Sequence, residues 1–343
     1  MGATATSTRV KRVAFEPASS LEETLAGTLV GQPAAIEAIV PYVKLYQAGL
    51  SPEGRPAGVF LLLGPTGTGK TKTAETLAEA LHGSEKSVLR IDCGEYQMEH
   101  EVAKLIGAPP GYLGHRETQP MLTQQRLNAV TSERSSLALV LFDEIEKAAP
   151  TMARLLLGIL DKAVLRLGDN TTVSFERSLI FLTSNLGARG MLKAMAPDFG
   201  FGAGAGMPAT DISRRLEGAG WSATRRKFSP EFINRIDQVI TYQPLSDGAL
   251  AEILDQHIEQ LQRHLQTRLG PRAFAIDVPR HSRQFLLRKG ASREYGAREL
   301  KRTLLRHVTQ PLAALVAGGQ IRPGSSVCLE LDEGSDSLVI RPM

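Results

Sequence analysis

The stretch that decides the fold is Val59-Phe60-Leu61-Leu62-Leu63-Gly64-Pro65-Thr66-Gly67-Thr68-Gly69-Lys70-Thr71. Its first five residues form a continuous apolar run, which is typical of a β-strand buried on both faces. The eight that follow fit the pattern G-x-x-x-x-G-K-[ST], in which glycines let the backbone curl so that successive N–H groups face phosphate oxygens. A helix predicted over residues 70–81 would add its positive N-terminal end. The stretch therefore predicts a phosphate-binding loop between a strand and a helix.

Two side chains of this loop have predicted roles of their own. Lys70 would reach the β- and γ-phosphates of a nucleotide, and the Thr71 hydroxyl would ligate Mg²⁺. A chance glycine turn is the alternative, but the position between a predicted strand and a predicted helix favours the phosphate loop. The predicted nucleotide contacts are Gly64, Pro65, Thr66, Gly67, Thr68, Gly69, Lys70 and Thr71.

A second apolar strand, predicted over residues 137–142, runs into Asp143 and Glu144. In P-loop ATPases an acid at this position holds Mg²⁺, usually through water, so we assign Asp143 to the metal. The adjacent Glu144 is then placed to polarise the attacking water as a general base. An acidic pair at a strand end is weak evidence alone, but it becomes strong evidence at this distance after a phosphate loop.

The next predicted strand closes with Thr183-Ser184-Asn185. On its own, Asn185 would be read as a turn residue. After the two preceding elements, an amide at this position predicts a group that orients the water between Glu144 and the γ-phosphate.

Short β-rich runs alternate with helical stretches over the first two thirds of the chain. Continuous apolar strands separated by helices indicate an α/β fold with a parallel sheet covered on both faces. Residues 21–50 have helical spacing, and Pro33 suits a first helical turn. The predicted strands are 59–63, 88–91, 137–142, 179–182 and 239–242.

The composition changes near Pro244, which predicts a second, smaller α+β domain. Ser246 can cap a helix whose apolar residues, Leu250 to Leu265, follow helical spacing. A strand-like run at 274–278, two helices and two final strands near 327–329 and 338–340 follow. The predicted organisation is a mobile tail at 1–20, a large domain at 21–243 and a small C-terminal domain at 244–343.

Composition bounds the remaining classes of function. The chain of 343 residues is 42% hydrophobic and 22% charged, which is typical of a globular protein. Its longest apolar runs are too short to cross a bilayer, and its N-terminus lacks a secretory core, so a cytoplasmic location is the default. Two cysteines exclude a disulfide framework, and the histidines have no metal-ligand spacing. The net charge of +4 does not indicate nucleic-acid binding, because the arginines are spread along the chain.

With these elements in order, the chain resembles an AAA+ ATPase, and more narrowly the second ATPase module of the Clp chaperones ClpB, ClpA and ClpC. The likeness runs from about Leu21 to the C-terminus. It is carried by Leu29-Val30-Gly31-Gln32, the phosphate loop, Leu105-Ile106-Gly107-Ala108-Pro109-Pro110-Gly111-Tyr112-Leu113-Gly114, Phe142-Asp143-Glu144-Ile145-Glu146-Lys147-Ala148, Thr183-Ser184-Asn185-Leu186-Gly187, Ser229-Pro230-Glu231-Phe232-Ile233-Asn234-Arg235-Ile236-Asp237 and Tyr295-Gly296-Ala297-Arg298-Glu299-Leu300-Lys301.

The resemblance implies a P-loop AAA+ sheet flanked by helices, followed by a smaller α+β lid domain, with ATP and Mg²⁺ as ligands. Arg235 resembles the arginine finger, which reaches a neighbouring subunit's nucleotide and therefore implies a homo-oligomeric ring, in this family a hexamer. Arg298 resembles the sensor arginine of the small domain, which contacts nucleotide in its own subunit. Val30 would lie near the adenine. Without the resemblance, both arginines would be read as surface or ion-pair residues.

The segment Gly111, Tyr112, Leu113 and Gly114 resembles the pore loop that grips a threaded polypeptide. An aromatic ring between glycines can pack against varied side chains while the loop swings. The alternative is an ordinary turn with an exposed tyrosine. The residues after the loop, and the region from 163 to 174, depart from the family's usual pattern, which puts the grip on substrate in doubt but leaves the phosphate chemistry intact.

Phe199, Gly200 and Phe201 open a glycine-rich loop that ends at residue 206. In Clp ATPases that work with a protease, an apolar-Gly-Phe tripeptide in this region docks onto the ClpP peptidase. An exposed pair of phenylalanines could fill a partner's apolar pocket. A low-complexity surface loop is the alternative, and both interpretations stay open.

The leading hypothesis is an ATPase that unfolds or remodels a protein substrate by threading it through the pore of a ring. A second hypothesis is an ATP-gated assembly or disassembly factor that acts on one dedicated complex without threading. A third, a nucleic-acid remodeller, lacks the basic patch with interleaved aromatic residues that it needs.

Overall fold

Five of the apolar runs form one parallel sheet in the order β2-β3-β6-β1-β7. The computed structural model describes residues 19–107, 120–195, 209–292, 295–332 and 336–343. The strands of the sheet are β1 (Gly58–Leu63), β2 (Leu89–Asp92), β3 (Ala138–Asp143), β6 (Ser178–Ser184) and β7 (Gln238–Thr241). Every residue of β1, β3 and β6 is buried, which confirms the expectation from their unbroken apolar sequences.

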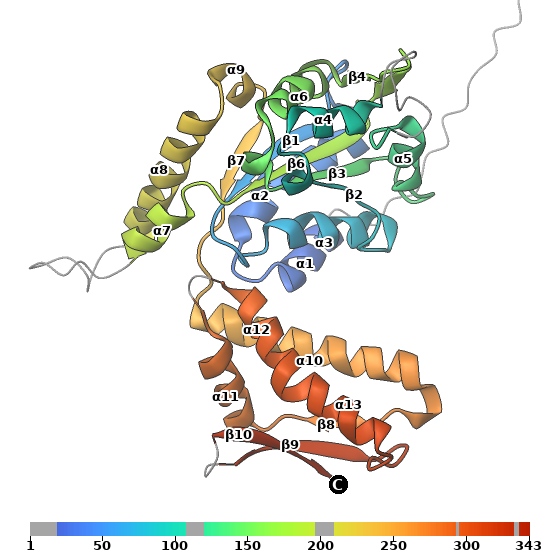
Figure 1. The fold of residues 1–343 in the computed structure, drawn as a ribbon, viewed down its shortest axis with the longest axis vertical. Coiled ribbons are helices and arrows are strands. Elements are labelled where there is room, and N and C mark those ends of the chain that lie inside the picture. The colour runs from blue at the N-terminus through green and yellow to red at the C-terminus, as the bar shows by residue number, and fades with distance from the viewer. Residues whose placement is uncertain (1–18, 108–119, 196–208, 293–294, 333–335) are drawn as a thin grey trace, which may run out of the picture.

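Helices cover both faces of this sheet (Figure 1). Alternate residues of β1 point to opposite faces, so Phe60 and Leu62 join one buried cluster while Val59, Leu61 and Leu63 join the other. One face carries α1 (Ser19–Thr28), α2 (Pro33–Gln47) and α3 (Lys70–His82); the other carries α4 (Glu99–Ile106), α5 (Gln124–Ala129) and α6 (Pro150–Lys162).

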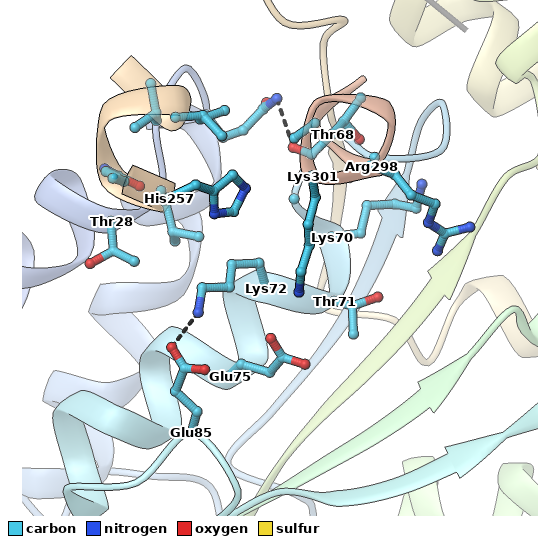
Figure 2. A pocket seen from close by; sticks show the side chains of 18 of the residues that line it. Thr28, Thr68, Lys70, Thr71, Lys72, Glu75, Glu85, His257, Arg298 and Lys301 are labelled. Carbon is cyan, nitrogen blue, oxygen red and sulfur yellow. Dashed lines mark hydrogen bonds and ion pairs between the residues drawn. The ribbon is translucent and has the colours of Figure 1, made fainter. Parts of the chain in front are cut away.

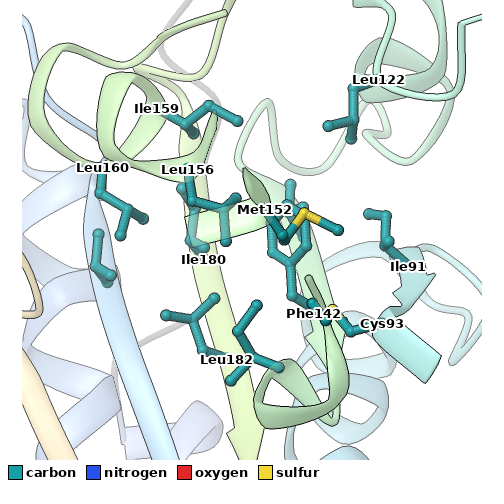
Figure 3. Packing of buried hydrophobic residues seen from close by; sticks show 14 of the residues in the cluster. Ile91, Cys93, Leu122, Phe142, Met152, Leu156, Ile159, Leu160, Ile180 and Leu182 are labelled. Carbon is teal, nitrogen blue, oxygen red and sulfur yellow. The ribbon is translucent and has the colours of Figure 1, made fainter. Parts of the chain in front are cut away.

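The core on the α6 face packs α6 directly onto the strands (Figure 3). Met152 and Leu156 of α6 lie against Phe142 of β3 and against Ile180 and Leu182 of β6. All five side chains are fully buried. Burying a side chain of this size contributes about 1.5–3 kcal/mol, so this face fixes β3 and β6 firmly side by side. The catalytic candidates that end these two strands are thereby held at one edge of the sheet.

Residues after β7 build a second unit with its own buried cluster. Its helices are α10 (Asp247–Leu269), α11 (Arg280–Gly290), α12 (Ala297–Leu304) and α13 (Gln310–Ala317), and its sheet has the order β10-β9-β8 with β8 (Ala275–Asp277), β9 (Ser326–Asp332) and β10 (Ser337–Pro342). Ser246 caps α10 by accepting a hydrogen bond from the Ala249 N–H, as its sequence predicts. The unit is α+β, as expected, while the division of the chain after residue 243 stays a prediction.

Several elements were not predicted. They are the hairpin β4 (Val164–Arg166) and β5 (Thr172–Ser174), the helices α7 (Ala188–Met195), α8 (Ala209–Lys227) and α9 (Pro230–Ile233), the 3₁₀ turns Cys93–Glu95, Ile145–Lys147 and Gly270–Arg272, and a π-helical turn at Leu305–Thr309. The hairpin strands are three residues long, too short for a periodic signal. The helical region predicted at 21–50 is two helices, because Gly31 adopts a left-handed conformation between them.

Within the described ranges, no helix has both the length and the apolar character needed to cross a bilayer. The predicted mobile tail at 1–20 extends too far, because Ser19 and Ser20 already belong to α1. Residues 1–18 of that tail, the pore-loop residues 111–114 and the docking residues 199–201 lie outside the described residues.

Candidate functional site

The phosphate loop joins β1 to α3 and is organised around the Lys70 ammonium group. Its Nζ donates to the carbonyl oxygens of Gly64 and Pro65, each at 2.7 Å, and to Asn185 Oδ1 at 3.0 Å. The side chain is almost fully buried, and this burial lowers the pKa of Lys70 to about 8 although Glu146, Asp143 and Glu144 act in the opposite direction. Lys70 is therefore a buried cation held by two neutral carbonyl oxygens, which negatively charged phosphate oxygens can replace.

Beside it, Thr71 meets Asp143 at the carboxyl end of β3. The Thr71 hydroxyl lies 3.3 and 3.4 Å from the two carboxylate oxygens of Asp143. A hydroxyl and a carboxylate are the hard oxygen ligands that Mg²⁺ prefers. The described residues include no cluster of three or more His, Cys, Asp or Glu that could hold a metal, and Mg²⁺ in nucleotide sites takes one or two protein ligands, with waters and phosphates supplying the rest. The pair therefore fits Mg²⁺.

The Asp143 carboxylate is held in place from two sides. Thr183 Oγ1 donates to its Oδ1, and Arg90 forms an ion pair with its Oδ2. Thr183 also accepts a hydrogen bond of 3.0 Å from the Glu144 N–H. One hydroxyl thus fixes the positions of both acidic residues.

Glu144 follows β3 in a left-handed backbone conformation, with φ of 56°. Such strain in a non-glycine residue persists where the surrounding structure holds it, and it is often found at functional sites. Glu144 Oε1 accepts a hydrogen bond of 3.2 Å from Asn185 Nδ2, and its Oε2 pairs with Lys147. Asn185 therefore contacts Lys70 through its oxygen and Glu144 through its nitrogen, so a single amide links the Lys70 ammonium group to the candidate base.

The small domain closes the site from the other side. A cavity of about 1300 Å³ lies between α1, the phosphate loop, α3, α10 and α12. Arg298 and Lys301 lie one turn apart on α12, and Figure 2 shows both side chains directed toward the side of the cavity where Lys70 and Thr71 lie. Two further cations of the lid domain thus reach the region where phosphate charge would collect.

The phosphate loop also touches the lid domain through backbone. The Ala297 N–H donates to the Gly67 carbonyl at 3.1 Å. A Cβ on Gly67 would lie 2.1 Å from the Tyr295 carbonyl oxygen, so this glycine permits a contact that other residues would block. We call residues 295–298 the lid turn.

The structure brings most of the predicted residues together. Val30, residues 66–71, Asp143, Glu144, Asn185 and Arg298 all line the cavity. Gly64 and Pro65 are not among the described lining residues, and their carbonyls instead hold Lys70.

Arg235 is placed elsewhere. It follows α9, and its guanidinium pairs with Asp161 at 3.5 Å and Glu231 at 3.3 Å. Among the described residues that line the cavity, Arg235 does not appear. This position gives it no role on the nucleotide of its own chain, and its predicted action on a neighbouring subunit stays a prediction.

Residue-by-residue reasoning missed several members of the site: Gln32, Arg90, Lys147, Thr183 and Lys301. A signal existed for Thr183, because the period of two in a strand places it on the same face as Asn185. Lys301 stands three residues after Arg298 on a helix and so shares its face. For Gln32 and Arg90 the sequence carries no such signal, since their partners are distant in the chain.

Comparison with protein families gives two matches. A model described as "AAA domain (Cdc48 subfamily)" matches residues 55–239. A second, described as "C-terminal, D2-small domain, of ClpB protein", matches residues 245–329.

Similar proteins include two named "Chaperone protein ClpB". The one from Corynebacterium diphtheriae is 36% identical over 321 residues, which cover 94% of this chain and 34% of the relative. The one from Meiothermus ruber is 36% identical over 305 residues, which cover 89% of this chain and 33% of the relative. The chain thus spans about a third of the length of these curated relatives.

Solved structures of Hsp104 are similar in fold. A Saccharomyces cerevisiae Hsp104:casein complex in an extended conformation has a TM-score of 0.80 and 26% identity, over 98% of this chain and 55% of that one. A closed-state cryo-EM reconstruction of Hsp104 with ATPyS and FITC casein has a TM-score of 0.77 and 26% identity, over 95% of this chain and 51% of that one.

Proposed function

The chain belongs to the AAA+ ATPase family, in its Clp chaperone branch, and we propose that it hydrolyses Mg-ATP in the cavity between its two domains to remodel a protein substrate. The observation that carries the proposal is the bridge made by Asn185, 3.0 Å from Lys70 Nζ and 3.2 Å from Glu144 Oε1. A cation for the γ-phosphate and a base for the attacking water are thereby joined by one amide. This is the arrangement that hydrolysis of a phosphoanhydride needs.

Each residue of the site has its own role in the proposed reaction. Lys70 exchanges the Gly64 and Pro65 carbonyls for phosphate oxygens, and the buried environment strengthens that attraction. Thr71 and Asp143 would hold Mg²⁺, which would neutralise phosphate charge. Glu144 takes the proton of the attacking water, and Asn185 orients that water. Lys147 forms an ion pair with Glu144 and so holds its carboxylate in position before the reaction.

The substitution Glu144→Gln tests the assignment of the base. It removes the proton acceptor and keeps the shape, so we expect ATP binding to persist while hydrolysis falls about 10²-fold or more. Glu37→Gln is the matched control, because Glu37 is exposed on α2 outside the cavity. Normal hydrolysis by the Glu144 variant would refute the proposed base. Client proteins retained by this variant in cells would identify the substrate.

We propose that the active unit is a homo-oligomeric ring, a hexamer, because Arg235 lies away from the nucleotide cavity of its own chain. Two solved Hsp104 structures similar to this chain are complexes with casein. By analogy, the ring would act on a polypeptide, with Tyr112 gripping it. This part of the proposal rests on the resemblance of residues 111–114 to a pore loop.

The alternative is an assembly or disassembly factor that does not thread its client. Tyr112→Ala separates the two, because threading requires the ring of Tyr112 whereas ATP hydrolysis does not. We expect this variant to lose substrate processing and keep basal ATPase activity. Survival of processing would favour the non-threading alternative.

A ClpP-like peptidase stays a proposed partner on the strength of Phe199, Gly200 and Phe201 alone. Deletion of these three residues should abolish peptidase-dependent proteolysis and leave ATPase activity intact. If the intact chain fails to bind ClpP, this partner is excluded.

A further inference from the structure

Gln32 is a buried glutamine whose side chain does not make the helix-capping hydrogen bond expected from its position. It is the N-cap residue of α2, yet its side chain makes no capping hydrogen bond to that helix. The residue is 5% exposed. A buried amide must find partners, and here the partners belong to other parts of the chain.

The amide of Gln32 connects the phosphate loop to the segment between β7 and α10. Its Nε2 donates to the Thr68 carbonyl at 3.1 Å and to the Gln243 carbonyl at 2.9 Å. Its Oε1 accepts from the Gln243 N–H at 3.3 Å. Both N–H donors and the oxygen of the side chain are thus used, all three on backbone groups. The hydrogen bond to Thr68 is drawn as a dashed line in Figure 2.

Gln243 stands at the connection between the two domains. The preceding residue, Tyr242, ends the sheet by donating its N–H to the Leu63 carbonyl at 2.7 Å, and its hydroxyl lies 2.6 Å from Thr73 Oγ1 on α3. Three residues after Gln243, Ser246 caps the first helix of the lid domain. A contact that fixes the position of Gln243 therefore also fixes where the lid domain begins.

The phosphate loop is held by consecutive carbonyls. The Gly67 carbonyl accepts from Ala297 of the lid turn, and the Thr68 carbonyl accepts from Gln32. Because the N–H groups of such a loop are needed for phosphates, holding it through its carbonyls leaves that face free. Gln32 and the lid turn together restrain the loop from outside the phosphate site.

We propose that Gln32 is a positioning residue, which ties the phosphate loop to the connection between the domains so that the two are ordered together. The inference rests on the proposed function, since the loop it orders is the proposed ATP site. Loss of the tie removes this partner from the Thr68 carbonyl, where the hydrogen bond is buried, and from the Gln243 carbonyl, where it is partly buried. The loop must then be ordered when nucleotide binds, and this weakens binding.

The variant Gln32→Met tests the tie because methionine has similar length and no donor. We expect amide exchange of peptides covering 64–71 and 242–246 to become about tenfold faster, with 138–143 unchanged. We also expect the Kd for a fluorescent ADP analogue and the KM for ATP to rise about tenfold, with kcat changing much less. A role in packing alone would not accelerate exchange in these two segments selectively.

Gln262→Met is the matched control. The Gln262 amide also donates to a backbone carbonyl, that of Phe274 at 2.9 Å, and accepts a backbone N–H, that of Ile276 at 2.8 Å, but within the lid domain. Its loss should leave exchange at 64–71 and 242–246 unaltered. Equal acceleration in both variants would overturn the inference.

The remaining outcomes are also decisive. If Gln32→Met leaves both segments unchanged, or accelerates the loop but not 242–246, the proposed tie is wrong. If circular dichroism shows that this variant does not fold, Gln32→Glu, which keeps the acceptor and loses the donors, replaces it with the same expected exchange. Failure of the unaltered chain to bind ADP would overturn the proposed function, while the exchange data would still decide the role of Gln32.

Discussion

The contact between Gly67 and the lid turn yields the sharpest structural prediction, through Gly67→Ala. A Cβ on Gly67 would lie 2.1 Å from the Tyr295 carbonyl oxygen, whereas real Cβ contacts essentially never fall below 3.0 Å. The Tyr295 oxygen belongs to the backbone and cannot rotate away as a side chain could, so the phosphate loop and the lid turn must separate by about 1 Å. The hydrogen bond from Ala297 N to Gly67 O, now 3.1 Å, would then exceed hydrogen-bonding distance.

Two costs follow for this variant. Alanine at the Gly67 φ of +76° is strained by about 1–2 kcal/mol. The lost hydrogen bond adds about 1 kcal/mol, and this second cost belongs to the lid contact alone. Gly69→Ala separates the two, because Gly69 also has positive φ, +103°, but has no atom within 4 Å of its Cβ position.

Amide exchange of a peptide covering residues 295–301, measured without nucleotide, reports the lid contact. We expect exchange about fivefold faster in Gly67→Ala, the factor that corresponds to about 1 kcal/mol, and no change in Gly69→Ala. Unaltered exchange in Gly67→Ala, or equal acceleration in both variants, would refute the argument that the loop and the lid turn are in direct contact.

Three further predictions concern the chemistry of the site. Burial lowers the pKa of Lys70 to about 8, and bound phosphates favour its charged form, so nucleotide binding should take up a proton above pH 8. Because half of the Lys70 side chains are already neutral at pH 8, the Kd for ADP should rise about fivefold from pH 8 to 9. Calorimetry at pH 8.5 in two buffers measures the proton uptake, and zero uptake would contradict the prediction. Thr183→Val removes the hydroxyl that Asp143 and Glu144 share, so the free energy of unfolding should fall by about 1–3 kcal/mol and kcat should drop. Thr183→Ser keeps the hydroxyl and should restore both values. An equal loss in the serine variant would show that the hydroxyl is not responsible. Arg235→Ala should lower kcat about 10³-fold. Mixing these subunits with Glu144→Gln subunits should restore part of the ATPase activity, because an Arg235→Ala subunit keeps the base and a Glu144→Gln neighbour supplies the arginine. No recovery on mixing would argue against action between subunits.

The sequence by itself determined the local parts of this protein. A strand that is apolar at every position must be buried on both faces, which predicts a covered parallel sheet, and β1, β3 and β6 have that burial. The phosphate loop was equally predictable, because its strand, glycines, lysine and helix are contiguous and its conformation depends on nearest neighbours. Asp143, Glu144 and Asn185 could be found because carboxyl ends of parallel strands share one edge of a sheet.

Only the tertiary structure decided which distant groups complete the site. Gln32 meets Gln243 across 211 positions of the chain, and Lys70 meets Asn185 across 115. The lid turn reaches Gly67 only because α12 packs in the second domain and presents its N-terminus to the loop. Such contacts depend on how separately packed units come together, and that arrangement is set by long-range burial rather than by any local pattern of residues.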